Sequence, residues 1–199
     1  GNTVMSETEL KKIANRKAKE ISRSCDLEAP AKALLDGDPG ATTYLARLQD
    51  EELFPDAVRF LAAALPKREA VWWACLCART APGDTPVPEA TRAIEGAEAW
   101  VYKPTEPHRR ATESLAESAT YEEPAAWAAM AAFWSGGSTA PEGQPVVPPG
   151  DELTGKAAAG AILLAAAKGD AAKMTECYRD FLAKGLDIAS GGDGRSASV

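Results

Sequence analysis

The chain has 199 residues, 45% of them hydrophobic and 26% charged, so it can bury the core of one domain or of two small helical subdomains, and wholesale disorder is excluded. Its net charge of −7 repels phosphate backbones, so we expect no nucleic-acid partner. Alanine recurs throughout and β-branched residues are sparse, which predicts an all-α protein.

The first predicted helix covers residues 6–24, where Ser6 and Glu9 have the spacing of a capping box. One face of this helix would be apolar, and the opposite face would carry a basic stripe of Lys12, Arg16, Lys19 and Arg23. Such a stripe is either a solvated helix face or a surface that docks onto an acidic surface, in this molecule or in another.

Prolines and glycines divide the following segment into short helices, because proline is tolerated in a first helical turn and breaks a helix interior. The pattern predicts a short helix after Pro30 that stops near Asp36, and a loop over residues 81–88. The other predicted helices of this segment cover residues 42–51, 56–65, 67–80, 89–102, 106–118 and 123–134.

The Gly/Pro-rich stretch 136–150 is the best internal boundary, since it is too long for a tight turn. It separates a main helical domain, residues 1–135, from a C-terminal helical hairpin, residues 151–189, that we expect to pack on that domain. Asp151 and Asp170 are placed to cap the hairpin's helices, predicted over residues 151–168 and 170–184. Residues 190–199 have the composition of a flexible tail.

Two segments of the chain are similar to each other when one is shifted by 54 residues, and we call this internal similarity the 54-residue echo. It would be a helix-pair repeat if the two segments also have the same structure. It lays Leu61, Ala62, Glu69, Trp73, Ala74 and Ala78 on Leu115, Ala116, Glu123, Trp127, Ala128 and Ala132. In an alanine-rich chain some matches of this kind are also expected by chance. Because both explanations stay open, the predicted architecture is either a multi-helix orthogonal bundle or an irregular α-solenoid-like array.

Large aromatic side chains stand among small ones in the helix predicted over residues 67–80. Trp73, Trp127 and Trp134 are predicted to be core residues, because each indole offers a large area for burial. Trp72 lies on another face, with Arg68 four residues before it and Arg79 seven after it. Guanidinium groups above and below the indole could make cation–π contacts, so Arg68, Trp72 and Arg79 are either a candidate interface or the rim of the core.

Neither the cysteines nor the histidine forms a pattern typical of a catalytic or metal site. Cys75 and Cys77 would point about 200° apart on a helix and cannot share an ion, so we predict buried thiols in a reducing compartment. His108, the single histidine, has no evident nucleophile or carboxylate motif beside it. The chain lacks the phosphate-binding, dinucleotide-binding, zinc-protease and serine-hydrolase motifs, and we expect no catalytic residue, cofactor or metal.

The stretch "LPKREAVWWACLCAR", residues 65–79, resembles a family of uncharacterised bacterial proteins whose genes are often found near type VI secretion clusters. The resemblance implies a cytoplasmic accessory role in a secretion-related system, and it brings no functional residues with it.

The sequence predicts a non-catalytic protein-interaction module, a scaffold or adaptor, with a protein partner. The alternative is an enzyme or a small-molecule-binding protein with an aromatic-lined pocket. We expect a cytoplasmic protein without membrane insertion, since the longest apolar run, residues 157–167, is shorter than the roughly 20 residues that a span requires. The sequence is also compatible with a homo-oligomer.

Overall fold

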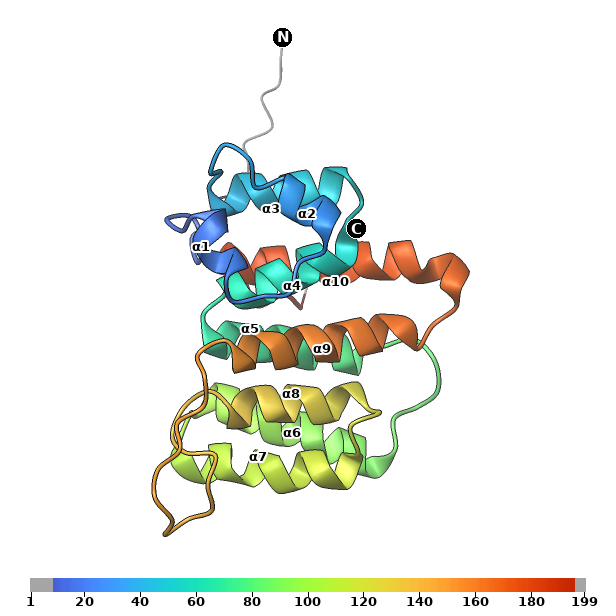
Figure 1. The fold of residues 1–199 in the computed structure, drawn as a ribbon. Coiled ribbons are helices and arrows are strands. Elements are labelled where there is room, and N and C mark those ends of the chain that lie inside the picture. Colours follow the sequence, from blue (N-terminus) through green and yellow to red (C-terminus); the bar gives the residue numbers. More distant parts are fainter. Residues whose placement is uncertain (1–8, 196–199) are drawn as a thin grey trace.

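The structure, a computed structural model, describes residues 9–195 and is all-α, as predicted (Figure 1). Within these residues the only β contact is a single bridge between Lys17 and Gly40. The helices are α1 (Ala18–Ser22), α2 (Ala29–Ala33), α3 (Ala41–Asp50), α4 (Phe54–Ala64), α5 (Lys67–Arg79), α6 (Pro88–Tyr102), α7 (Glu106–Ala119), α8 (Pro124–Phe133), α9 (Leu153–Ala167), the 3₁₀ turn η1 (Ala171–Lys173) and α10 (Met174–Ala189).

The prediction of one continuous helix up to residue 24 is wrong. Ser6 lies outside the described residues, residues 11–15 form turns, and α1 is only five residues long. Backbone hydrogen bonds to distant segments interrupt the helix: the Ala18 N–H donates to the Pro39 carbonyl, and the Ala41 N–H donates to the Arg16 carbonyl. These contacts hold Lys17 in an extended conformation, so tertiary pairing overrides local helix propensity.

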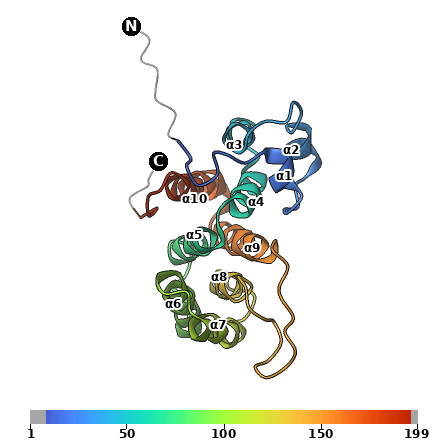
Figure 2. The ribbon, with the colours of Figure 1, turned by 90° about the vertical axis from the view of Figure 1, so that its left-hand side faces the viewer.

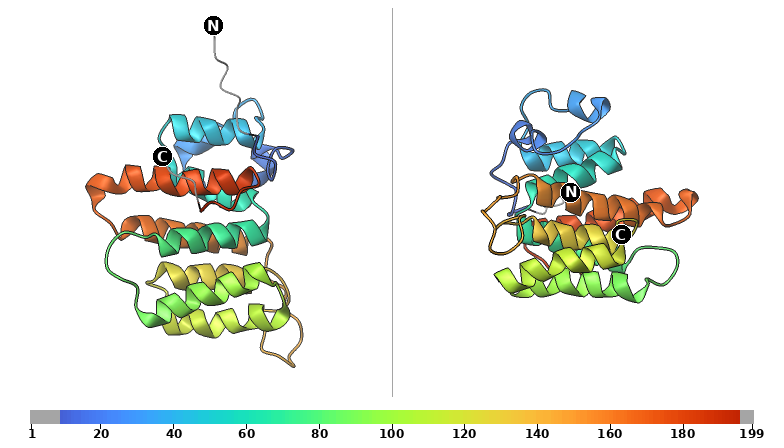
Figure 3. Two further views of the ribbon diagram at one scale, coloured as in Figure 1. Left: turned by 180° about the vertical axis from the view of Figure 1, so that it is seen from behind. Right: turned by 60° about the horizontal axis from the view of Figure 1, so that its bottom comes forward.

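From α4 onward the helices lie side by side in layers, and their packing makes an all-α bundle (Figures 1 and 2). Figure 2, which looks nearly along the helices, shows α10 beside α4, α5 beside α9, and α6 beside α8, with α7 closing one end of the stack. From behind, α10, α5 and α6 lie toward the viewer (Figure 3, left), whereas α9 and α8 lie toward the viewer in Figure 1.

Helix α9 lies inside this stack, where it packs against α4, α5 and α8. Small residues make these close contacts possible, because α9 is built mainly of alanine and glycine. At Gly155, an added Cβ would lie only 3.0 Å from the Ala62 carbonyl oxygen on α4. The second half of the predicted hairpin, α10, packs on α4 and α5, and the Asp170 carboxylate caps η1 by accepting a hydrogen bond from the Ala172 N–H.

The residues of the 54-residue echo lie on two helix pairs, α4–α5 and α7–α8, but their tryptophans differ in burial. Trp73 is fully buried, and it packs against Gly185 of α10, where a Cβ would come within 2.6 Å of the indole. Trp127 is only half-buried, and it faces Gly160 of α9. Trp134 is also half-buried, so the prediction that Trp127 and Trp134 are core residues is wrong.

Candidate functional site

The two arginines of the interface predicted on α5 are exposed, but both make hydrogen bonds within the chain. The Arg68 guanidinium donates to the Val101 carbonyl at 2.5 Å, near the carboxyl end of α6. Arg79 makes two hydrogen bonds, of 2.8 and 2.6 Å, to the carboxylate of Glu98. Both arginines therefore fasten α5 to α6.

Trp72 is half-buried, and residues from the end of the chain cover part of it. Its indole N–H donates to the Asp193 carbonyl at 2.7 Å, and the Arg195 guanidinium lies 5.0 Å from the ring centroid. The cation over Trp72 is thus Arg195 and not Arg68 or Arg79, so the predicted partners of the ring were wrong. Whether this surface binds a protein stays a prediction.

The basic residues near the N-terminus do not form a helical stripe, because the continuous helix is absent. Lys12 pairs with Glu69 of α5 at 3.4 Å, and Arg16 donates to the Ala64 carbonyl at the end of α4. Two members of the predicted stripe thereby join the N-terminal segment to the α4–α5 corner. Lys19 and Arg23 are exposed.

The residues around His108 hold the connector in place. His108 Nδ1 lies 2.7 Å from the Lys103 carbonyl oxygen. Arg109, only 2% exposed, binds both carboxylate oxygens of Glu106 and donates to the Phe133 and Ser138 carbonyls. The buried guanidinium therefore fastens the start of the connector to α7.

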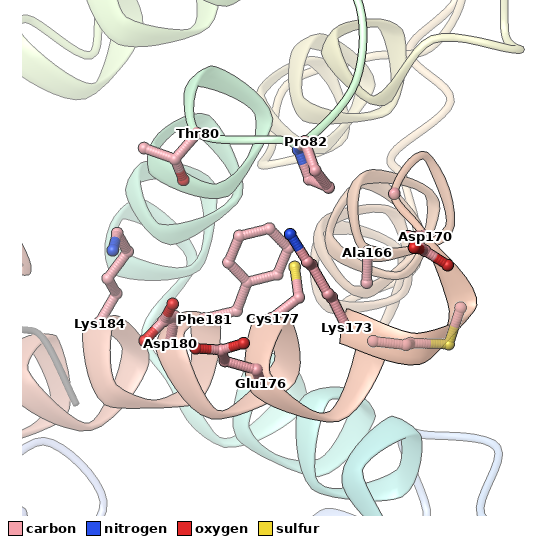
Figure 4. Close-up of a pocket in the computed structure, with 12 residues that line it drawn as sticks. Thr80, Pro82, Ala166, Asp170, Lys173, Glu176, Cys177, Asp180, Phe181 and Lys184 are labelled. Carbon is pink, nitrogen blue, oxygen red and sulfur yellow. The ribbon is translucent and has the colours of Figure 1, made fainter.

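A hollow of about 250 Å³ lies between α10 and the loop after α5 (Figure 4). Cys177 and Phe181 project from α10 into this region, near Lys173 and Asp180. Burial, and after it the charge of Asp180, raises the pKa of the Cys177 thiol. The thiol is therefore protonated at neutral pH, which is the opposite of the activation that a nucleophilic cysteine needs.

A larger apolar groove of about 600 Å³ lies between α8 and α9. These two helices are neighbours in the stack (Figure 1). Tyr121, Trp127 and Trp134 form its α8 side. Residues of α9 at helical spacing form the other side: Leu153, Lys156, Ala157, Gly160, Leu163 and Leu164. We call these nine residues the α8–α9 groove.

The apolar lining follows from the sequence of α9. Its inner face packs in the stack, and its outer face carries leucines and a glycine, with Lys156 as the one charged residue. Leu153, Leu163, Trp127 and Trp134 are consequently left half-buried beside one another. Apolar side chains gathered along one surface are typical of an interaction site.

Tyr121 and Trp127 form a fixed pair at one end of the groove. The Trp127 indole N–H donates to the Tyr121 carbonyl at 2.9 Å, and the two ring centroids lie 5.3 Å apart. Burial, followed by the charges of Glu117 and Glu113, raises the pKa of the Tyr121 hydroxyl. Because the indole N–H of Trp127 donates to the Tyr121 carbonyl, the polar edge of this ring already has its partner within the chain.

A smaller hollow of about 120 Å³ continues the groove across α9 toward α1 and α4. It shares Lys156, Gly160 and Leu163 with the groove, and Arg59 and Asp26 border its far side. Lys156 lies 3.7 Å from the carboxylate of Asp26, which is 87% exposed. Among the described residues, Arg59 Nη1 is a buried atom without a hydrogen-bond partner, although it lies 3.5 Å from the Asp56 carboxylate.

Sequence reasoning missed the groove because it assigned the tryptophans to the core. A signal was present, however: Lys156 is the one charged residue in the segment 153–167, so this helix is apolar on nearly all sides. A helix of that kind is expected to have neighbours all round it.

Among the described residues, no helix is both long enough and apolar enough to cross a membrane. Within the same residues, no three His, Cys, Asp or Glu side chains are grouped so that they could hold a metal ion.

The comparisons with known proteins give a family but no activity. Residues 44–189 match the model of a family described as "Family of unknown function (DUF6931)". No curated protein and no solved structure matches the chain. The matched range includes the stretch 65–79 and the whole α8–α9 groove, whereas Lys12, Arg16, Lys19 and Arg23 lie before it. The chain therefore belongs to this family of unknown function.

Proposed function

We propose that the protein is a non-catalytic interaction module that binds another protein through the α8–α9 groove. The observation that carries the proposal is the accessible face formed by Trp127, Trp134 and the leucines of α9. Tryptophan is enriched among residues that dominate binding energy at protein interfaces, and water leaves apolar surface favourably when a partner covers it.

The residue types of the groove favour a binding role over catalysis. Lys156 is the one charged side chain among its nine lining residues. A general acid–base or nucleophilic mechanism would need a second reactive group within hydrogen-bond reach of the reacting atoms. The proposed role is that of a scaffold or adaptor in the cytoplasm, as an accessory of a bacterial secretion system.

The test compares proteins that co-purify from native lysate with the wild type and with two matched variants. Leu163→Glu places a charge in the groove, whereas Val146→Glu places the same charge at a 73% exposed apolar residue of the connector. We expect Leu163→Glu to lose a partner that the wild type and Val146→Glu retain, with all three equally folded by circular dichroism. Retention of every partner by Leu163→Glu would refute the groove as the interface.

The double variant Arg68→Ala with Arg79→Ala examines the α5 surface in the same experiment. We expect it to keep the partner and to melt at a lower temperature, because both arginines bind α6. Loss of the partner in this variant alone would move the interface to α5.

A further inference from the structure

The shape of the α8–α9 groove matches a helix. Trp127 and Trp134 are seven residues apart, which is about two turns, or roughly 10 Å, along α8. On α9 the lining residues recur every three or four positions. Two helices that lie side by side leave a straight channel between their outer surfaces, and a third helix can lie along it at the usual 8–10 Å between axes.

Gly160 lies midway along the α9 side of the channel. Its only neighbour within 4 Å of an added Cβ is the Trp127 indole, at 4.0 Å. The absence of a side chain here lets the backbone of an incoming helix approach α9 closely, while the flanking leucines contact its sides.

The polarity of the groove disfavours an extended peptide. An extended segment brings unpaired backbone N–H and C=O groups that need partners when they are buried. The groove has few polar atoms to supply, and the Trp127 indole N–H already donates to Tyr121. A helix satisfies its own backbone hydrogen bonds and can therefore bury an apolar face against such a surface.

The positive charge of Lys156, beside the hollow that leads toward α4, favours an occupant that carries a carboxylate. The side chain of Lys156 is 43% exposed, and its partner Asp26 is 3.7 Å away and mostly in solvent, so this pair is weak. Arg59 Nη1, at the adjoining hollow, is buried and already lies 3.5 Å from the buried Asp56 carboxylate, so Lys156 is the accessible cation. A carboxylate on the occupant could approach Lys156.

A second copy of this chain is a poorer occupant, since two molecules that each carry a net charge of −7 repel one another. We propose, on the basis of the function proposed above, that the groove binds an amphipathic helix of a partner protein. That helix presents apolar residues at positions i, i+3 or i+4, and i+7, together with an Asp or Glu that faces Lys156.

The experiment selects binders from a phage-displayed library of random 16-residue peptides on the whole wild-type protein, with removal of clones that also bind Leu163→Glu. We expect a consensus with the apolar spacing given above and one acidic position. Synthetic peptides of the best clone, with that position as Glu or as Lys, are then titrated by fluorescence anisotropy.

The charge contact has its own control. We expect Lys156→Ala to weaken binding of the Glu peptide by about 2–5-fold, the range of a partly exposed ion pair. We expect Lys156→Glu to reverse the preference, so that it binds the Lys peptide more tightly than the Glu peptide. Equal affinities of wild type for the two peptides would overturn the acidic part of the proposal.

The outcomes also separate this inference from the proposed function. A consensus that is proline-rich or basic, or the absence of any clone that depends on Leu163, overturns the helical occupant. If Leu163→Glu nevertheless loses its partner in native lysate, the proposed protein-binding function stands, although the occupant is then not a helix of this kind. A dimer in sedimentation velocity that Leu163→Glu abolishes would identify a second copy as the occupant and would also overturn this inference.

Discussion

Replacement of Trp73 and of Trp127 by alanine should have very different effects, although the two residues occupy matching positions in the echo. Trp73 is fully buried, its indole N–H donates to the Phe181 carbonyl at 2.8 Å, and α10 covers the ring at Gly185. Trp127 is half-buried and forms one wall of the α8–α9 groove. The pair therefore tests whether the groove really lies at the surface.

For Trp73→Ala, the loss of a buried indole costs about 3–5 kcal/mol of unfolding free energy, which in a chain of this size lowers Tm by roughly 6–20 °C. For Trp127→Ala, part of the ring already contacts water, so the expected cost is about 1–2 kcal/mol. Chemical denaturation followed by circular dichroism measures both values. Equal losses in the two variants would show that Trp127 is a core residue, and the groove would then have no basis.

Three further results are expected. Arg109→Ala should cost about 2–3 kcal/mol and speed proteolysis of the connector, because the Phe133 and Ser138 carbonyls lose their donor; unchanged proteolysis would contradict the anchoring role. Gly155→Ala should cost about 1–3 kcal/mol in urea denaturation, because the added methyl group meets the backbone of α4. Burial, together with the charges of Asp26 and Asp56, raises the pKa of Cys25 to about 11 from 9.0, so unfolding becomes easier as the pH rises from about 9 to 11; Cys25→Ser should lack that part of the pH dependence.

The direction in which Cys25 changes the stability with pH follows from proton binding. The folded state keeps the Cys25 proton to a higher pH than the unfolded state, so this group's stabilising contribution is complete below about 9 and is lost as the pH rises through the folded pKa. An unfolding free energy that rose with pH over this window, relative to Cys25→Ser, would contradict the burial of the thiol.

The sequence predicted the helices from α3 to α9 well, because local signals set their ends, whereas the last one, predicted over residues 170–184, is α10 at Met174–Ala189. Pro88 and Pro124 stand in the first turns of α6 and α8, and Thr105 accepts a hydrogen bond from the His108 N–H at the start of α7. Such signals act within one turn and can be recognised without a tertiary structure. The helix predicted at the N-terminus failed for the opposite reason, since the hydrogen bonds that interrupt it come from residues more than twenty positions away.

The candidate site was much less predictable than the fold. The 54-residue echo placed Trp73 and Trp127 at equivalent positions, but α10 covers the Trp73 ring at Gly185, whereas Trp127 is left half-buried. Likewise, the spacing of Arg68, Trp72 and Arg79 suggested a cation–π cluster, whereas Glu98 and the carboxyl end of α6 attract the two guanidinium groups away from the ring. Contacts between distant segments decide both cases.

The most direct test of the central claim, that the α8–α9 groove binds a protein, is photo-crosslinking inside living cells. Benzoylphenylalanine is placed at position 163 in the groove and, as a control, at position 146 in the connector. We expect one discrete covalent adduct with another protein at position 163 and none of that size at position 146. The same adducts at both positions, or no adduct at position 163, would show that the groove does not bind a protein.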